Sequence, residues 1–196
     1  MTELAHAGHP PTSTGLNTFK VGFWVFLGSE TLFFGSLIST YMVYKNESVV
    51  GPYTTEIFDI PLTSISTFVL LMSSLAMVLA LDAVQRSWRK GGLIWIMATA
   101  LLGATFLGFQ AYEFTEFYHH GLKLQTNLLG SSFFVLTGFH GAHVTIGVIW
   151  LLILWLEAFR GRLPASRSLT LEIAGLYWHF VDIVWIVIFT LIYLIQ

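Results

Sequence analysis

The sequence lacks cysteine altogether and has few charged residues. Without cysteine it has no disulfide, no thiolate metal site, no iron–sulfur cluster and no covalent c-type haem attachment. Only 10% of its 196 residues are charged, against about 25% in an ordinary soluble domain. Such a chain has too little charge to cover the surface of a soluble enzyme or to stay disordered in water. The net charge of −2 gives no indication of a nucleic-acid partner, and we expect none.

Apolar residues dominate instead: they make up 55% of the chain, and the mean hydropathy is +0.73. The hydrocarbon core of a bilayer is about 30 Å thick, which takes roughly 20 apolar residues of helix. The long apolar runs are continuous rather than alternating, which favours helices over barrel strands. The sequence therefore predicts an all-α, polytopic membrane protein with five transmembrane helices, at about 21–44, 62–84, 93–112, 129–156 and 173–195.

The segment before the first span is polar. Residues 1–20 are predicted to form a flexible tail, and His6 and His9 within it are interpreted as ordinary tail residues rather than metal ligands. The tail lacks the basic-then-apolar layout of a cleaved signal peptide, so we expect the first span to act as an uncleaved insertion signal. Residues 21–196 are predicted to form one five-helix membrane domain, because the connections are too short for a second one.

Lysine and arginine are distributed unevenly among the connections. Positive charge is retained on the cytoplasmic side of a membrane protein. With a cytoplasmic N-terminus and an external C-terminus, only Lys45 and Lys123 would face outward. The inward segments would then hold Lys20, Arg86, Arg89, Lys90, Arg160, Arg162 and Arg167. This asymmetry predicts that orientation and agrees with an odd number of spans.

Small and aromatic residues within the spans indicate how the helices pack. Helices in lipid associate through close backbone approach, so Ser29 and Ser36, at a seven-residue interval, are interpreted as a packing seam. Aromatic residues near span ends, Tyr41 and Tyr193 among them, are predicted to lie in the interfacial belt.

Ionisable residues deep in the spans are the most informative feature, since each costs several kcal/mol in lipid unless it is paired or neutral. Glu30 lies about ten residues into the first span, hence about 15 Å deep. Counting inward along the fourth and fifth spans gives similar depths for their histidines and Asp182. We therefore predict one buried polar cluster joining spans one, four and five, made of Glu30, His140, His143, Glu172, His179 and Asp182.

Three chemistries fit such a cluster. Histidines and carboxylates on facing helices are the raw material of metal or haem sites in helix bundles. The same residue types carry protons within membranes. The third interpretation is interhelical hydrogen bonding that fixes packing, with Glu30 neutral because burial disfavours the charged carboxylate. Spacing alone leaves all three open.

Four segments of the chain resemble subunit III of the haem–copper terminal oxidases. They are GFWVFLGSETLFFGSL at 22–37, FQAYEF at 109–114, GSSFFVLTGFHGAHVTIG at 130–147 and YWHFVDIVWIVIFTLIY at 177–193. The resemblance implies a chain with no catalytic residue, no metal and no cofactor of its own, beside partner subunits that hold haem and copper. It implies packing against subunit I, with subunit II in the same complex.

The resemblance also implies roles for the polar cluster. Subunits of this family bind phospholipid between their helices and support proton uptake during sustained turnover. Carried onto this chain, the family's buried glutamate is Glu30, its buried histidines are His140, His143 and His179, and its acidic partners are Glu172 and Asp182. This disfavours the metal interpretation and leaves lipid or proton handling against packing.

The longer members of the family have two further helices ahead of the region that this chain matches. The short form is similar to bacterial caa3-type and quinol oxidase subunits, which implies a multi-pass protein of a bacterial plasma membrane. Cytochrome c oxidase is the favoured complex; a quinol oxidase, or a related subunit of a nitric-oxide reductase, is the alternative. A free-standing proton channel is more remote, because the spans show no internal duplication and no interior proline.

Overall fold

The computed structural model describes residues 18–45 and 59–195. In that part of the chain, five helices are long and apolar enough to cross a membrane, and no β-strand occurs. A short 3-10 turn, η1 (Ala165–Arg167), precedes the last helix, and a π-helical segment, η2 (Thr190–Leu194), follows it. The helices are α1 (Thr18–Tyr44), α3 (Ile60–Gln85), α4 (Arg89–His119), α5 (Leu128–Phe159) and α6 (Ser168–Phe189). The predicted all-α architecture with five spans is confirmed.

Most helix ends lie beyond the predicted span limits, and the largest difference is at α4. The third span was predicted to end at residue 112, but α4 continues to His119. A helix satisfies its own backbone hydrogen bonds in the headgroup region as well as in hydrocarbon, whereas hydropathy detects only the hydrocarbon part. The predicted tail lies outside the described residues, except for 18–20, which belong to α1.

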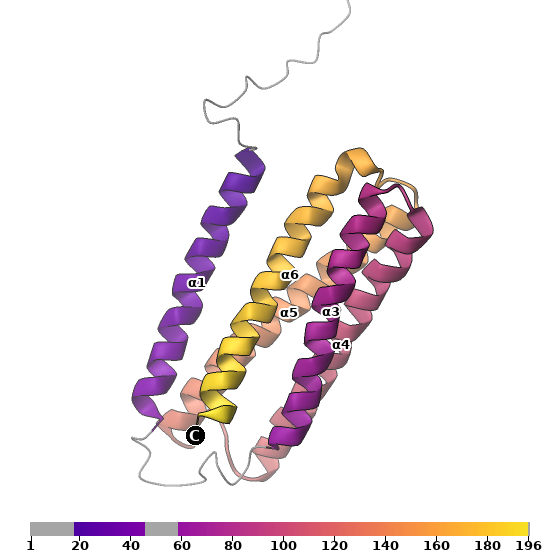
Figure 1. Cartoon of the computed structure of the whole chain (residues 1–196). Coiled ribbons are helices and arrows are strands. Elements are labelled where there is room, and N and C mark those ends of the chain that lie inside the picture. Colours follow the sequence, from indigo (N-terminus) through magenta and orange to yellow (C-terminus); the bar gives the residue numbers. More distant parts are fainter. Residues whose placement is uncertain (1–17, 46–58, 196) are drawn as a thin grey trace, which may run out of the picture.

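Four of the helices form a closed ring. α3 packs against α4 and α6, and α5 packs against the same two helices from the other side. Successive helices run in opposite directions, and α1 stands outside the ring with its main contacts to α5 and α6 (Figure 1). The start of α1, the α3–α4 turn and the α5–α6 connection therefore share one end, here called the basic end, which holds Lys20, Arg86, Arg89, Lys90, Arg160, Arg162 and Arg167.

The helix ends are set by local sequence. Asp59 caps α3 by accepting from the Leu62 amide, and Asn127 caps α5 by accepting from the Gly130 amide. At the other end of α5 the chain leaves the helix through Gly161, whose φ of 73° suits a residue without a Cβ atom. These residues satisfy backbone groups that the helix ends leave without an intrahelical partner.

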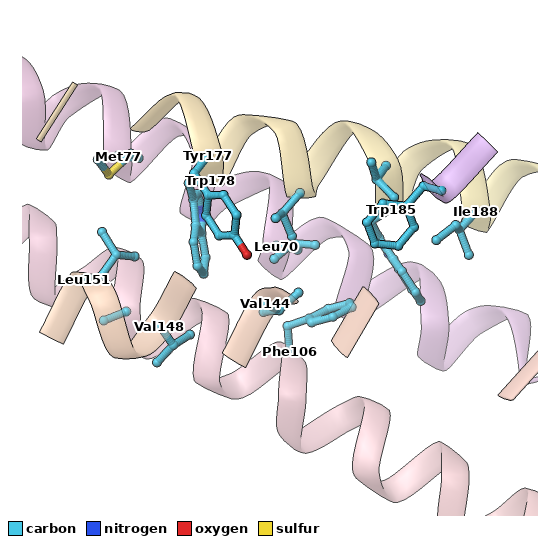
Figure 2. Packing of buried hydrophobic residues seen from close by; sticks show 14 of the residues in the cluster. Leu70, Met77, Phe106, Val144, Val148, Leu151, Tyr177, Trp178, Trp185 and Ile188 are labelled. Carbon is cyan, nitrogen blue, oxygen red and sulfur yellow. The ribbon is translucent and has the colours of Figure 1, made fainter. Parts of the chain in front are cut away.

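Two tryptophans of α6 fill the centre of the ring. Trp178 and Trp185 are 1% and 2% exposed, and Figure 2 shows them projecting from α6 toward Leu70, Phe106 and Val144. Each indole N–H donates to a hydroxyl on α3: Trp178 to Ser73 Oγ and Trp185 to Thr67 Oγ1, both at 2.9 Å. A buried indole therefore combines a large packing surface with a satisfied polar group, and both tryptophans join α6 to α3.

Two glycines make room for Trp178. A Cβ atom at Gly103 on α4 would lie 2.5 Å from the Trp178 ring, and one at Gly147 on α5 would lie 2.8 Å from it. Gly108, five residues further along α4, has nothing within 4 Å of such an atom. The ring thus lies in a slot that only glycine leaves open, and Gly108 provides a matched control on the same helix.

We expect Gly103→Ala to lower the free energy of unfolding by about 1–3 kcal/mol, because overpacking forces the indole or the helices to shift. Gly108→Ala should leave stability unchanged or raise it slightly, since alanine is the better helix former by about 1 kcal/mol. Thermal denaturation of the two variants in the same detergent compares them. Equal stability of both would contradict the close packing at Gly103.

Helix α1 buries a narrow stripe and exposes the rest. Its buried residues Leu27, Phe34 and Tyr41 are seven apart and face α5 and α6. Ser29 and Ser36, predicted to form a packing seam, lie instead on the exposed face and donate to carbonyls of their own helix. The small-residue face of α1 therefore points away from the described parts of this chain.

Candidate functional site

Glu30 and His143 form a contact between α1 and α5. Glu30 Oε2 lies 3.2 Å from His143 Nε2, and the two side chains are 20% and 16% exposed. His143 Nδ1 lies 2.7 Å from the Phe139 carbonyl oxygen one turn earlier. A carbonyl only accepts, so Nδ1 carries a hydrogen and Nε2 faces the carboxyl. One proton therefore lies in the Glu30–His143 contact, either on the carboxyl or on the imidazole.

Aromatic rings surround this pair. The ring of Phe34, on α1, lies 5.0 Å from His143 edge-on, and that of Phe33 lies 6.4 Å away. The phenyl rings leave water little room, and in an apolar setting the contact between carboxyl and imidazole is stronger than in water. The pair is therefore suited to hold a proton, or to bind a polar group that reaches the contact between α1 and α5.

His140, one turn before His143 on α5, lies in a different environment. It is fully buried, and neither ring nitrogen has a hydrogen-bond partner within the described residues. Its ring stacks on Trp185 with centroids 4.9 Å apart and an interplanar angle of 25°, and Phe106 contacts it edge-on. His140 is thus held by aromatic packing at the centre of the ring of helices.

His179 and Asp182, on α6, face α3. His179 Nδ1 lies 2.7 Å from the Ser74 hydroxyl. Asp182 is 3% exposed, and neither carboxyl oxygen meets the criteria for a hydrogen bond within the described residues, although Ser74 lies near enough to act on it too. A buried carboxyl with so few hydrogen bonds is costly. Ser74, on α3, is the described residue that offers it a hydrogen bond.

Glu172 lies at the basic end, apart from the other acidic residues of the predicted cluster. Its carboxylate is 2.6 Å from the ammonium group of Lys20, and both side chains are about one-third exposed. This ion pair links the start of α6 to the start of α1. Exposed pairs of this kind contribute at most about 1 kcal/mol, so its main effect is to fix where α1 meets α6.

The structure thus divides the six predicted residues among separate contacts instead of one cluster. Glu30 meets His143 between α1 and α5, His179 and Asp182 face Ser74 on α3, and Glu172 pairs with Lys20. Residues three apart on a helix point about 60° apart. His143 therefore faces α1 while His140 faces α4 and α6. The sequence-based depth count could not separate these directions.

One buried carboxyl was missed by the sequence analysis. Glu113 was assigned to the external connection, yet it is only 5% exposed on α4. It accepts from the Thr63 hydroxyl on α3 and bonds Tyr193 of η2, next to the buried Tyr41 of α1. The available signal was spacing: Phe106, Gln110, Glu113 and Phe117 recur at three- and four-residue intervals and form one buried stripe.

Tyr41 and Tyr193 correct another prediction. Both were expected in the interfacial belt, but they are 0% and 1% exposed. The Tyr193 hydroxyl bonds Glu113, and Tyr41 lies beside Tyr193, where α4 continues to His119 beyond the predicted span. Beside them, a pocket of about 240 Å³ lined by Asp59, Glu116 and His120 reaches Glu113 from the end opposite the basic one.

Within the described residues, no three histidine, aspartate or glutamate side chains converge in a way that could hold a metal ion. The polar contacts join pairs of helices, and the tryptophan core fills the space between them. The motifs TGFHGAHV and YWHFVDIVW lie on α5 and α6. Residues 2–196 of the sequence match the family model for cytochrome c oxidase subunit III. The chain belongs to the cytochrome c oxidase subunit III family.

Relatives of this subunit III occur with both kinds of oxidase. Cytochrome c oxidase subunit 3 of Bacillus sp. (strain PS3) is 42% identical over 183 residues, covering 93% of this chain and 88% of the relative. Quinol oxidase subunit 3 of Bacillus subtilis (strain 168) is 42% identical over 174 residues, covering 89% and 85%. Cytochrome c oxidase subunit 3 of the same strain is 41% identical over 184 residues, covering 93% and 88%. The chain is equally similar to subunits of both oxidase classes.

Proposed function

We propose that this subunit III is a non-catalytic part of a bacterial oxygen reductase of the cytochrome c oxidase type. It packs against subunit I, with subunit II in the same complex, and those partners hold the haem and copper. The single observation that carries the proposal is that most of the predicted polar residues join helices: Glu30 to His143, Ser74 to His179 and Lys20 to Glu172. Such contacts stabilise a scaffold, and within the described residues no three potential metal ligands converge.

The faces without a helix partner support association with other subunits. The exposed side of α1 presents Gly28, Ser29, Gly35 and Ser36, and that of α4 presents Ala104 and Gly108. Small residues let the backbones of transmembrane helices approach closely. A quinol oxidase remains the second candidate, because the identity to quinol oxidase subunit 3 is 42% against 41% for cytochrome c oxidase subunit 3 of the same strain.

The orientation follows from the charges. The basic end holds seven lysines and arginines, whereas Lys45 and Lys123 lie at the other end. Positive charge is retained on the cytoplasmic side, so the basic end faces the cytoplasm of a bacterial plasma membrane and the C-terminus faces outward.

Within this scaffold, the Glu30–His143 pair supports proton uptake and lipid binding. It shares one proton, it is partly exposed along the seam between α1 and α5, and it lies within the span. Glutamate and histidine side chains in contact at this depth are typical of intramembrane proton handling. The polar carboxyl also offers a partner to a lipid that enters the seam.

Glu30→Gln tests this role. The amide N–H₂ can still donate to His143 Nε2, so packing is preserved while the shared proton is removed. We expect full assembly and an initial rate of oxygen reduction close to that of the unmodified complex, with several-fold fewer turnovers before inactivation or a loss of bound lipid. Oxygen consumption over prolonged turnover and lipid counting by mass spectrometry measure both.

Glu157→Gln makes the same chemical change on α5 near the basic end and serves as the control. Immediate loss of oxygen reduction in assembled Glu30→Gln complex would contradict the non-catalytic role. Unchanged durability together with unchanged lipid content would show that the pair only packs.

A further inference from the structure

A pocket of about 220 Å³ lies at the basic end, far from Glu30. Residues of the α3–α4 turn and of the α5–α6 connection line it, and these two segments lie on the side of the ring away from α1 (Figure 1). Most of its lining is apolar, from Val84, Ala158, Leu163, Pro164 and Ala165. The one charged residue in the lining is Arg89. A single cation at the edge of an apolar pocket is an arrangement that suits an amphipathic ligand.

Arg89 is held in place at this pocket. Its Nη2 donates to the Phe159 carbonyl at 2.7 Å, and the guanidinium lies against Gly161. A guanidinium has five N–H donors, and this bond uses one of them. Arg89 forms no ion pair with a carboxylate of the described residues. The charge is therefore fixed in position but not neutralised, which favours an anion as its partner.

The surroundings of the pocket are also positive. The two connections that border it, residues 85–90 and 159–168, contain no acidic residue and six basic ones: Arg86, Arg89, Lys90, Arg160, Arg162 and Arg167. Of these, Arg86 is paired with Asp82 on its own helix at 2.8 Å. Each lysine or arginine near a membrane surface contributes about 1 kcal/mol toward binding anionic lipid.

We propose that this pocket binds an anionic phospholipid, with the phosphate on Arg89 and an acyl chain against the apolar lining. A free phosphate would use the guanidinium but not the apolar wall, whereas a lipid uses both. Charge complementarity and the position at the end of the spans both match a headgroup at the membrane surface. The site extends the proposed lipid-binding role to a second place and does not depend on the Glu30–His143 pair.

The test uses the complete oxidase complex in nanodiscs of phosphatidylcholine with phosphatidylglycerol as the minor lipid. Phosphatidylglycerol retained after extraction into mild detergent is counted by native mass spectrometry. We expect Arg89→Gln to weaken retention about fivefold, the equivalent of one lost cationic contact. Arg89→Lys should keep most of it. Lys123→Gln, at the opposite end, is the control and should change nothing.

A second variant tests the apolar half of the site. Ala165→Phe fills the pocket without altering its charge. We expect it to release the lipid although Arg89 is still present. If Arg89→Gln does not assemble, Ala165→Phe still tests the site. Equal retention by the unmodified, Arg89→Gln and Ala165→Phe complexes would overturn the proposal, and so would an equal loss in Lys123→Gln. Displacement of the lipid by inorganic phosphate alone would identify a free-anion site instead. Co-purification of subunit I is scored separately, so that failure of this site is distinguished from failure of the proposed function.

Discussion

Replacing Trp178 with alanine is expected to lower the free energy of unfolding by about 3–5 kcal/mol, the range measured for removing large aromatic side chains from protein cores. Trp178 is 1% exposed and lies between Gly103 and Gly147. Its indole N–H donates to Ser73 on α3. Apolar burial alone adds little to association in lipid, so the loss comes from packing contacts and from the indole–hydroxyl bond, while Ser73 keeps its bond to the Leu70 carbonyl.

Trp24→Ala is the matched control, because Trp24 on α1 is 59% exposed. We expect it to leave stability within about 0.5 kcal/mol, as for surface substitutions in general. Thermal unfolding of the complex in one detergent, followed by near-ultraviolet circular dichroism, compares the two variants. Similar midpoints for Trp178→Ala and Trp24→Ala would contradict the central place of Trp178 in the core.

The second large effect is expected at Glu113. Glu113→Leu removes the carboxyl that accepts from the Thr63 hydroxyl and bonds Tyr193, and leaves Thr63 with the Asp59 carbonyl as acceptor. A buried hydroxyl that loses a partner costs about 1–3 kcal/mol, and here that cost falls mainly on Tyr193. Because these residues come from α3, α4 and η2, and Tyr41 of α1 lies beside them, the substitution should loosen one whole end of the bundle.

Amide hydrogen exchange checks this locally. We expect faster exchange in Thr190–Leu194 and at the end of α1 in Glu113→Leu, with little change at the basic end. Glu113→Gln keeps an acceptor oxygen and should retain most of the protection. Glu116→Leu, on the same helix but with a half-exposed side chain, should leave exchange unaltered. Exchange in Glu113→Leu that matches the unmodified protein would show that the carboxyl does not hold this end together.

Hydropathy was sufficient to find the five spans, because about 20 continuous apolar residues are needed to cross a bilayer in helical form. The same criterion failed at the ends of the helices. α4 continues to His119, where the residues are too polar to count toward a hydrocarbon span. Glu113 was for that reason assigned to a connection, although its spacing from Phe106 and Gln110 places it on the buried stripe.

The sequence identified most of the polar residues of the site, but not which of them contact one another. Depth along a span follows from counting residues, and Glu30 and His143 do meet. The direction in which a side chain points around its helix becomes useful only once the neighbouring helices are placed. The sequence of a single span does not give that placement. His140 and His143 therefore seemed to share a cluster, whereas one packs on Trp185 and the other faces Glu30. Ser74 has no charge to mark it in the sequence.

The Glu30–His143 contact differs from the other polar contacts of the predicted cluster. The Phe139 carbonyl fixes the hydrogen on His143 Nδ1, which leaves Nε2 for the contact with Glu30. The Ser74–His179 and Lys20–Glu172 contacts instead join helices. In the proposed function, the Glu30–His143 pair handles protons or lipid, and the other two contacts serve the scaffold.

The central claim is that this subunit is a scaffold without a redox centre of its own. The most direct measurement is to purify the complex through a tag on this chain, separate the chain in detergent, and determine haem by its absorbance and copper by elemental analysis in each fraction. Haem and copper are expected with subunits I and II, and none on the separated chain. Stoichiometric haem or copper on the separated chain, or a tagged chain that brings down neither partner, would contradict the claim.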